Sequence, residues 1–173
     1  MHPDSGEKKF PKPKSIIGDI DVNDLENALL YGFTICYAQG LSQLKSTSEE
    51  KKYGLNCENI CKIWRGGCII RAKILENFMT AFQRDPDLDN LVFDSEISLM
   101  IKETDYHARK VSVFAINNKI PSLALNSSIS YLDALSTAKL PMNLIQAQRD
   151  CFGEHTFERI DMDGIFHNEN WQS

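Results

Sequence analysis

The sequence has none of the features of a membrane, secreted or nucleic-acid-binding protein. No apolar run approaches the roughly 18 residues that a membrane-spanning helix needs. The segment MHPDSGEKKFPKPK is charged and lacks the apolar centre of a secretory signal. Lysine and arginine do not cluster, and the formal net charge is −5. We therefore expect a cytoplasmic protein with no membrane or nucleic-acid partner, whose residues 1–20 form a disordered or loosely docked arm.

Metal-ligand patterns are also scarce. The five cysteines are an odd number, and most of them fall on apolar faces of predicted helices. Cys57 and Cys61 lie four residues apart and could share a metal ion. However, no second Cys/His pair follows at zinc-finger spacing. We expect reduced, buried thiols and no metal site.

Strands and dinucleotide-binding turns are missing as well. The nine glycines are scattered, and the only adjacent pair, Gly66-Gly67, follows a predicted helix. A dinucleotide site needs a strand, a glycine-rich turn and a helix in that order. No alternating pattern of apolar and polar residues extends over a strand. The sequence predicts an all-α fold that binds no cofactor by itself.

Apolar residues at helical spacing do recur along the chain. Asp21 is a candidate N-cap, with Asp24 in the first turn of a helix reaching about residue 45. Beyond Gly153 the pattern ends, so 21–153 is predicted as one helical domain and 154–173 as an extended tail. The predicted buried stripe of the first helix is Leu25, Leu29, Phe33, Cys36, Gly40 and Leu44. Further helices are predicted over about 56–63, from Ile70 to Phe82, after Asp94 to Phe114, over 125–135, and from Pro141 to Gly153.

Two places could bind an anion on chemical grounds. Arg65-Gly66-Gly67 precedes a predicted helix, whose N–H groups could act with Arg65 and Arg71; the alternative, which we favour, is that the glycines allow tight packing. Arg149 and His155 flank a predicted helix end, where a guanidinium fork suits phosphate and an imidazole adds a donor or proton relay. The alternative is that Arg149 caps its own helix and His155 is solvated. His107 is predicted to be a surface residue.

Four segments follow one another in this order: CYAQGL, KIWRGGCIIRAKIL, LPMNLIQAQRDCFGEHTFERID and DGIFHNENW. Together they resemble the C-terminal domain of the decarboxylating 6-phosphogluconate dehydrogenases. The resemblance implies an all-α domain with long antiparallel helices and a C-terminal tail. It also implies an NADP-dependent oxidoreductase of the pentose phosphate pathway, which converts 6-phosphogluconate to ribulose 5-phosphate and CO2 as a homodimer. Arg149 and His155 match residues that bind substrate in the partner subunit's site.

The chain also departs from the family pattern. The cofactor-binding domain and the segments that carry the family's catalytic lysine and glutamate have no counterpart in the 173 residues. The resemblance therefore places NADP in the intact enzyme and predicts that this chain alone is catalytically incomplete. Two hypotheses follow: the C-terminal domain of an active dehydrogenase, or a free-standing, non-catalytic helical protein that dimerises or pairs with a full-length relative.

Overall fold

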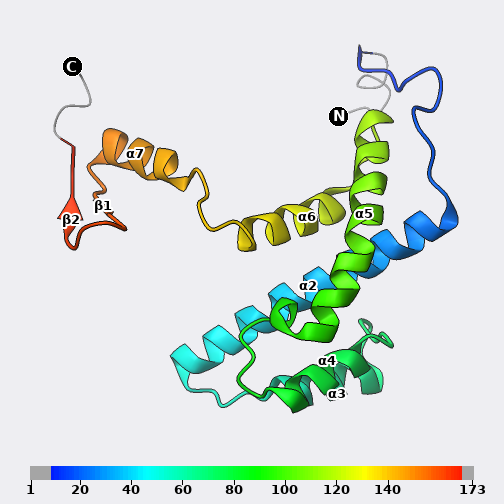
Figure 1. Ribbon diagram of the computed structural model, residues 1–173, viewed down its shortest axis with the longest axis horizontal. Helices are drawn as coiled ribbons and strands as arrows, with labels where there is room; N and C mark the ends of the chain where they lie inside the picture. The colour runs from blue at the N-terminus through cyan, green and yellow to red at the C-terminus, as the bar shows by residue number, and fades with distance from the viewer. Residues whose placement is uncertain (1–8, 169–173) are drawn as a thin grey trace. The chain divides into compact units, whose positions relative to one another are not determined.

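The computed structural model describes residues 9–168, which fall into two compact units that meet between Leu132 and Asp133 in the sequence. Figure 1 shows that helices account for nearly all the regular structure drawn for these residues. The predicted all-α class is confirmed. The helices are α2 (Val22–Lys51), α3 (Cys57–Gly67), α4 (Leu75–Arg84), the short 3-10 helix η1 (Leu91–Phe93), α5 (Ser95–Asn117), α6 (Leu123–Leu135) and α7 (Met142–Gly153).

The start of α2 is the N-cap that the sequence predicts. The Asp21 carboxylate accepts a hydrogen bond from the Asp24 N–H at 2.8 Å, and the Asp24 carboxylate accepts one from the Asp21 N–H at 3.1 Å. This reciprocal arrangement satisfies two N–H groups that a helix start leaves without partners. The helix ends where Lys52 adopts the left-handed conformation, with φ of 56°.

The core of the first unit lies where α2 packs along α5, with α3 and α4 packed together beside them. These elements bury their large apolar side chains because each carries an apolar stripe at helical spacing. Seven large hydrophobic side chains are fully buried: Tyr31, Ile35, Leu41, Leu75, Phe78, Leu91 and Ile97.

The buried face of α2 is not the predicted one. Leu25, Leu29 and Phe33 are 47%, 60% and 51% exposed, whereas Tyr31 and Ile35 are fully buried. The hydrophobic pattern alone could not select the face, because both faces of this helix carry large apolar residues. The buried face of α2 is the one that also carries Ala28 and Ala38, whose small side chains permit close helix packing.

The α3–α4 connection also differs from the prediction. Helix α4 begins only at Leu75, and the preceding Ile69 is fully exposed in a turn. Gly66 and Gly67 lie in the last turn of α3 rather than before a helix. Phe78 and Phe82 are buried, as the stripe predicts.

The second unit consists of α7 and a small hairpin. Helix α7 starts directly after Pro141, where a proline is tolerated because its missing N–H would have no helical partner. Strands β1 (Phe157–Glu158) and β2 (Ile165–Phe166) pair antiparallel, with Phe157 opposite Phe166. Strands of two residues are too short to show an alternating pattern, so the sequence could not predict this hairpin.

Candidate functional site

The structure brings Arg149 and His155 to one open hollow in the second unit. Arg149 lies in the last turns of α7, and its Nη1 donates to Gln146 Oε1, one turn earlier, at 2.9 Å. Among residues 9–168, the His155 imidazole has no hydrogen-bond partner, so its nitrogens can bind a ligand. The hollow measures about 420 Å³ and is lined by Gln146, Arg149, His155, Thr156, Phe157, Glu158 and Ile165.

The backbone around His155 has an unusual conformation. Glu154 and Thr156, on either side, both have positive φ values, 52° and 61°. The left-handed region is particularly unfavourable for a β-branched residue such as Thr156, at a cost on the order of 1–3 kcal/mol. Such a turn persists only where its surroundings fix it, so the position of His155 depends on contacts made by its neighbours.

The residue before this turn makes room for the imidazole. A Cβ atom added to Gly153 would lie 2.8 Å from His155 Nε2 and 2.9 Å from Cδ2. Real Cβ atoms essentially never lie within 3.0 Å of such an atom, so the ring occupies space that only glycine leaves open. Gly153 therefore allows His155 to lie against the end of α7.

Asp150 fixes the contacts of the turn, and the sequence reasoning missed it. Its fully buried carboxylate accepts from the Thr156 N–H at 3.0 Å and the Asn168 N–H at 3.0 Å. His167 Nδ1 lies 2.8 Å from Asp150 Oδ1 and is the donor, because a carboxylate only accepts. One signal was available: an acidic residue in the last turn of a helix opposes the helix dipole and needs compensating donors.

His107 is not the surface residue that the sequence predicts. Its Nδ1 lies 2.7 Å from the buried carboxylate of Asp24, and the Lys110 ammonium donates to the same carboxylate at 2.6 Å. Hydrogen bonds from Lys110, His107 and the Asp21 N–H hold the pKa of Asp24 well below its usual range. These contacts join the start of α2 to α5, which is a structural role.

The glycine pair does not form the anion site considered above. Because Gly66 and Gly67 end α3, they do not present the N–H groups of a helix start. Arg65 is instead paired with Glu76 of α4, with Nε and Nη2 at 3.0 Å and 2.9 Å from Oε1. The structure does not support the packing alternative either, because Gly66 and Gly67 are exposed and no atom lies within 4 Å of a Cβ added to either of them.

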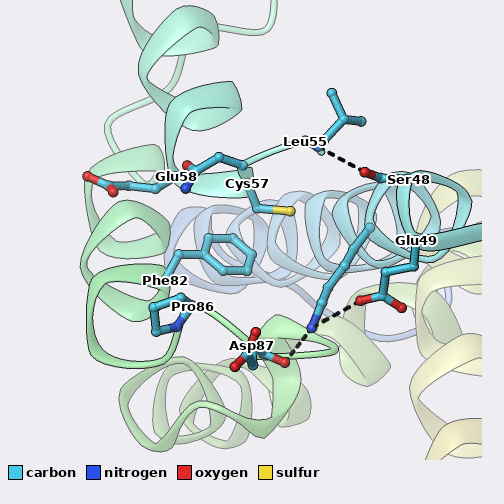
Figure 2. A pocket seen from close by; sticks show the side chains of 10 residues that line it. Ser48, Glu49, Leu55, Cys57, Glu58, Phe82, Pro86 and Asp87 are labelled. Atoms are coloured by element: carbon cyan, nitrogen blue, oxygen red, sulfur yellow. Dashed lines mark hydrogen bonds and ion pairs between the residues drawn. The ribbon is translucent and has the colours of Figure 1, made fainter. Parts of the chain in front are cut away.

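Cys57 borders a small hollow of about 160 Å³ in the first unit, shown in Figure 2 with Ser48, Phe82 and Asp87 around it. Ser48 Oγ accepts from the Leu55 N–H at 2.9 Å, so it already has a backbone partner. Burial raises the pKa of the Cys61 thiol to about 12, which disfavours the thiolate that a metal needs. Within residues 9–168 no group of three or more His, Cys, Asp or Glu side chains could hold a metal ion.

No helix among the described residues is both long and apolar enough to cross a membrane.

A family model described as "6-phosphogluconate dehydrogenase, C-terminal domain" matches residues 5–171. Individual proteins with names from the same family are also similar in sequence. A rice protein named "6-phosphogluconate dehydrogenase, decarboxylating 1" is 44% identical over 149 residues, which are 86% of this chain and 31% of that protein. A Bacillus subtilis protein named "6-phosphogluconate dehydrogenase, NADP(+)-dependent, decarboxylating" is 43% identical over 148 residues, 86% of this chain and 32% of its own length.

A solved structure is also similar. It is described as Plasmodium falciparum 6-phosphogluconate dehydrogenase in its apo form, in complex with its cofactor NADP+ and in complex with its substrate 6-phosphogluconate. The match has a TM-score of 0.86 and 40% sequence identity, and it covers 96% of this chain and 37% of that chain. This chain thus spans about a third of the length of the relatives it matches.

Proposed function

The chain belongs to the 6-phosphogluconate dehydrogenase family and corresponds to its C-terminal domain. We propose that it provides two substrate-binding residues, Arg149 and His155, of a decarboxylating, NADP-dependent enzyme. That enzyme acts in the cytoplasm, in the pentose phosphate pathway, and converts 6-phosphogluconate to ribulose 5-phosphate and CO2. The observation that supports the proposal is that Arg149 and His155 line one hollow. Both side chains are exposed there, and the His155 imidazole has no hydrogen-bond partner within residues 9–168.

The chemistry of Arg149 suits binding rather than proton transfer. A guanidinium offers several N–H donors in a planar fork, and the bond to Gln146 uses only one of its nitrogens. Arginine is too basic to exchange a proton during the reaction. We therefore assign Arg149 to the phosphate and His155 to a neighbouring oxygen of 6-phosphogluconate. The base and acid for the oxidation and decarboxylation come from elsewhere in the intact enzyme.

We propose further that the chain assembles as a two-fold homodimer, in which each copy contributes to the partner's site. The α2 face that carries Leu25, Leu29 and Phe33 is exposed in the single chain, and Val22 continues it at 79% exposure. An apolar stripe of this kind is unusual on a monomer and typical of an interface. Closed two-fold pairing is the commonest way to bury such a surface.

The substrate role can be tested in a chimera in which this chain replaces the matching third of the Bacillus subtilis relative. Arg149→Ala should raise the KM for 6-phosphogluconate by roughly 10- to 150-fold, because a lost charge-assisted contact costs about 1.5–3 kcal/mol. The matched control is Arg159→Ala, which removes an exposed arginine that pairs with Asp161 instead. An unchanged KM for Arg149→Ala would contradict the proposal.

The 173-residue chain by itself should neither bind NADP nor turn over 6-phosphogluconate. Dinucleotide binding needs a strand–turn–helix unit with glycines at the turn, and residues 9–168 contain only the two short hairpin strands. Titration calorimetry with NADP, and absorbance of reduced cofactor with both substrates at millimolar levels, measure the two activities separately. Saturable binding or steady NADPH formation would require a cofactor site in this chain.

A further inference from the structure

One residue, Asp150, binds both sides of the turn that carries His155, one side through its backbone carbonyl and the other through its buried carboxylate. The Asp150 backbone carbonyl accepts from the Glu154 N–H at 2.9 Å, and the Asp150 side chain accepts from the Thr156 N–H at 3.0 Å. The amides that flank His155 are therefore both bound by the same residue. Because Asp150 directly follows Arg149 on α7, these bonds also set the position of His155 relative to Arg149.

The same carboxylate binds the end of the hairpin. His167 and the Asn168 N–H donate to it from just beyond β2, at 2.8 Å and 3.0 Å. Ile165, in β2, lines the hollow together with Arg149 and His155. Asp150 thus connects α7 to the turn and to the hairpin of β1 and β2, and residues of all three line the hollow. Figure 1 labels α7, β1 and β2.

The burial of this charge indicates that the contacts are strong. A carboxylate that is fully removed from water is stable only when N–H donors replace the water. Among residues 9–168, three donors from two separate segments converge on the two carboxylate oxygens. Two of these donors are backbone N–H groups, so rotation of the donors' own side chains cannot break the bonds.

We infer that Asp150 is a positioning residue of the proposed substrate site. Its buried carboxylate holds His155 and the hairpin in place relative to Arg149. The inference rests on the proposed role of Arg149 and His155. Asp150 contacts no substrate in this scheme; it acts through the turn. Without the carboxylate, the left-handed Thr156 has no anchor, and His155 leaves the position beside Gly153.

The test begins with the 173-residue chain, where no substrate is needed. Asp150→Asn keeps the shape but places an NH2 group against one of the three donors. We expect amide hydrogen exchange at Thr156 and Asn168 to become roughly 10-fold faster or more. The matched control, Asp163→Asn, changes an exposed aspartate of the same unit and should alter neither rate by more than about twofold. Unchanged exchange at Thr156 in Asp150→Asn overturns the inference.

A second variant keeps the test decisive if Asp150→Asn disturbs the whole of α7. His167→Ala removes one donor but leaves the carboxylate and its bond to Thr156. We expect faster exchange at Asn168, with the Thr156 rate changed by less than about twofold. If Asn168 exchange does not change, the bond from His167 does not help to hold the end of the hairpin, and that step of the inference is wrong.

The chimera separates positioning from a general effect on folding. Asp150→Asn should raise the KM for 6-phosphogluconate in the same direction as His155→Ala. A residue that acts through His155 should add almost nothing in the double variant, whereas independent effects on KM would multiply. Multiplied effects overturn the inference. If His155→Ala and Arg149→Ala themselves leave KM unchanged, the proposed function fails, and the exchange rates still decide whether Asp150 holds the turn.

Discussion

The two units of the chain are held together by different forces. In the first unit, the largest buried side chains are apolar, among them Tyr31, Phe78 and Leu91. In the second unit, the only residue buried within 133–168 is Asp150, while Leu144, Phe152 and Ile160 are 73%, 81% and 98% exposed. The first unit has its own hydrophobic core. The second is ordered locally by one carboxylate, and most of its large apolar side chains lie in water.

This difference relates directly to function. A unit with its own core is stabilised by burying apolar surface, which contributes about 25 cal/mol for each Å² removed from water. A unit without one must gain that burial elsewhere, and a partner subunit or a further part of the enzyme would provide it. The proposed substrate residues belong to the second unit. We therefore expect the site to be fully formed only when that unit is covered.

The largest effect should come from the core of the first unit. Phe78→Ala leaves a cavity in a fully buried site and should lower the free energy of unfolding by about 3–5 kcal/mol. Phe152→Ala makes the same change at an exposed position of the second unit and should cost less than about 0.5 kcal/mol in the monomer. Urea unfolding of both variants measures the contrast. Equal losses would show that the two units do not differ in this way.

The next effect concerns the exposed stripe of α2. Phe33→Asp should weaken the proposed dimer, because a two-fold interface loses the side chain twice. At about 1–1.5 kcal/mol for each half-exposed ring, Kd should rise roughly 30- to 150-fold. Sedimentation at micromolar concentration measures the change, with Gln39→Asp as an exposed polar control on the same helix. A wild-type chain that is strictly monomeric under these conditions would contradict the dimer itself.

The sequence predicted the first unit better than the second, for physical reasons. The cap at Asp21 consists of local hydrogen bonds between near neighbours, so residue identity alone reveals it. The buried face of α2 was predicted wrongly, because Leu25 and Ile35 are both large and apolar and only the packing partner decides between them.

In the second unit, sequence and resemblance pointed to Arg149 and His155, and the structure places both at one hollow. Their substrate role stays a prediction. Asp150 was missed because its partners, Thr156 and Asn168, use backbone N–H groups that every residue has. An acidic residue in the last turn of a helix signals a need for donors, but no pattern of side chains identifies which backbone N–H groups supply them. The last five residues of the predicted tail, 169–173, lie outside the described residues.

The smallest effect on stability should accompany a clear effect on the site. Gly153→Ala replaces glycine within the last turn of α7, where alanine is the better helix former by up to about 1 kcal/mol. The added Cβ would lie 2.8 Å from His155 Nε2, and a side chain can move away at little cost. We therefore expect the free energy of unfolding to stay equal or to rise slightly, while the His155 ring leaves its place against the helix end. In the chimera, KM for 6-phosphogluconate should rise, and in the 173-residue chain the imidazole signals of His155 should shift in NMR spectra.

The control is Gly66→Ala. Gly66 is a helical glycine with no atom within 4 Å of an added Cβ, so this substitution should change neither KM nor the His155 signals. If Gly153→Ala shifts neither the His155 signals nor KM, then space at the helix end does not set the position of this ring.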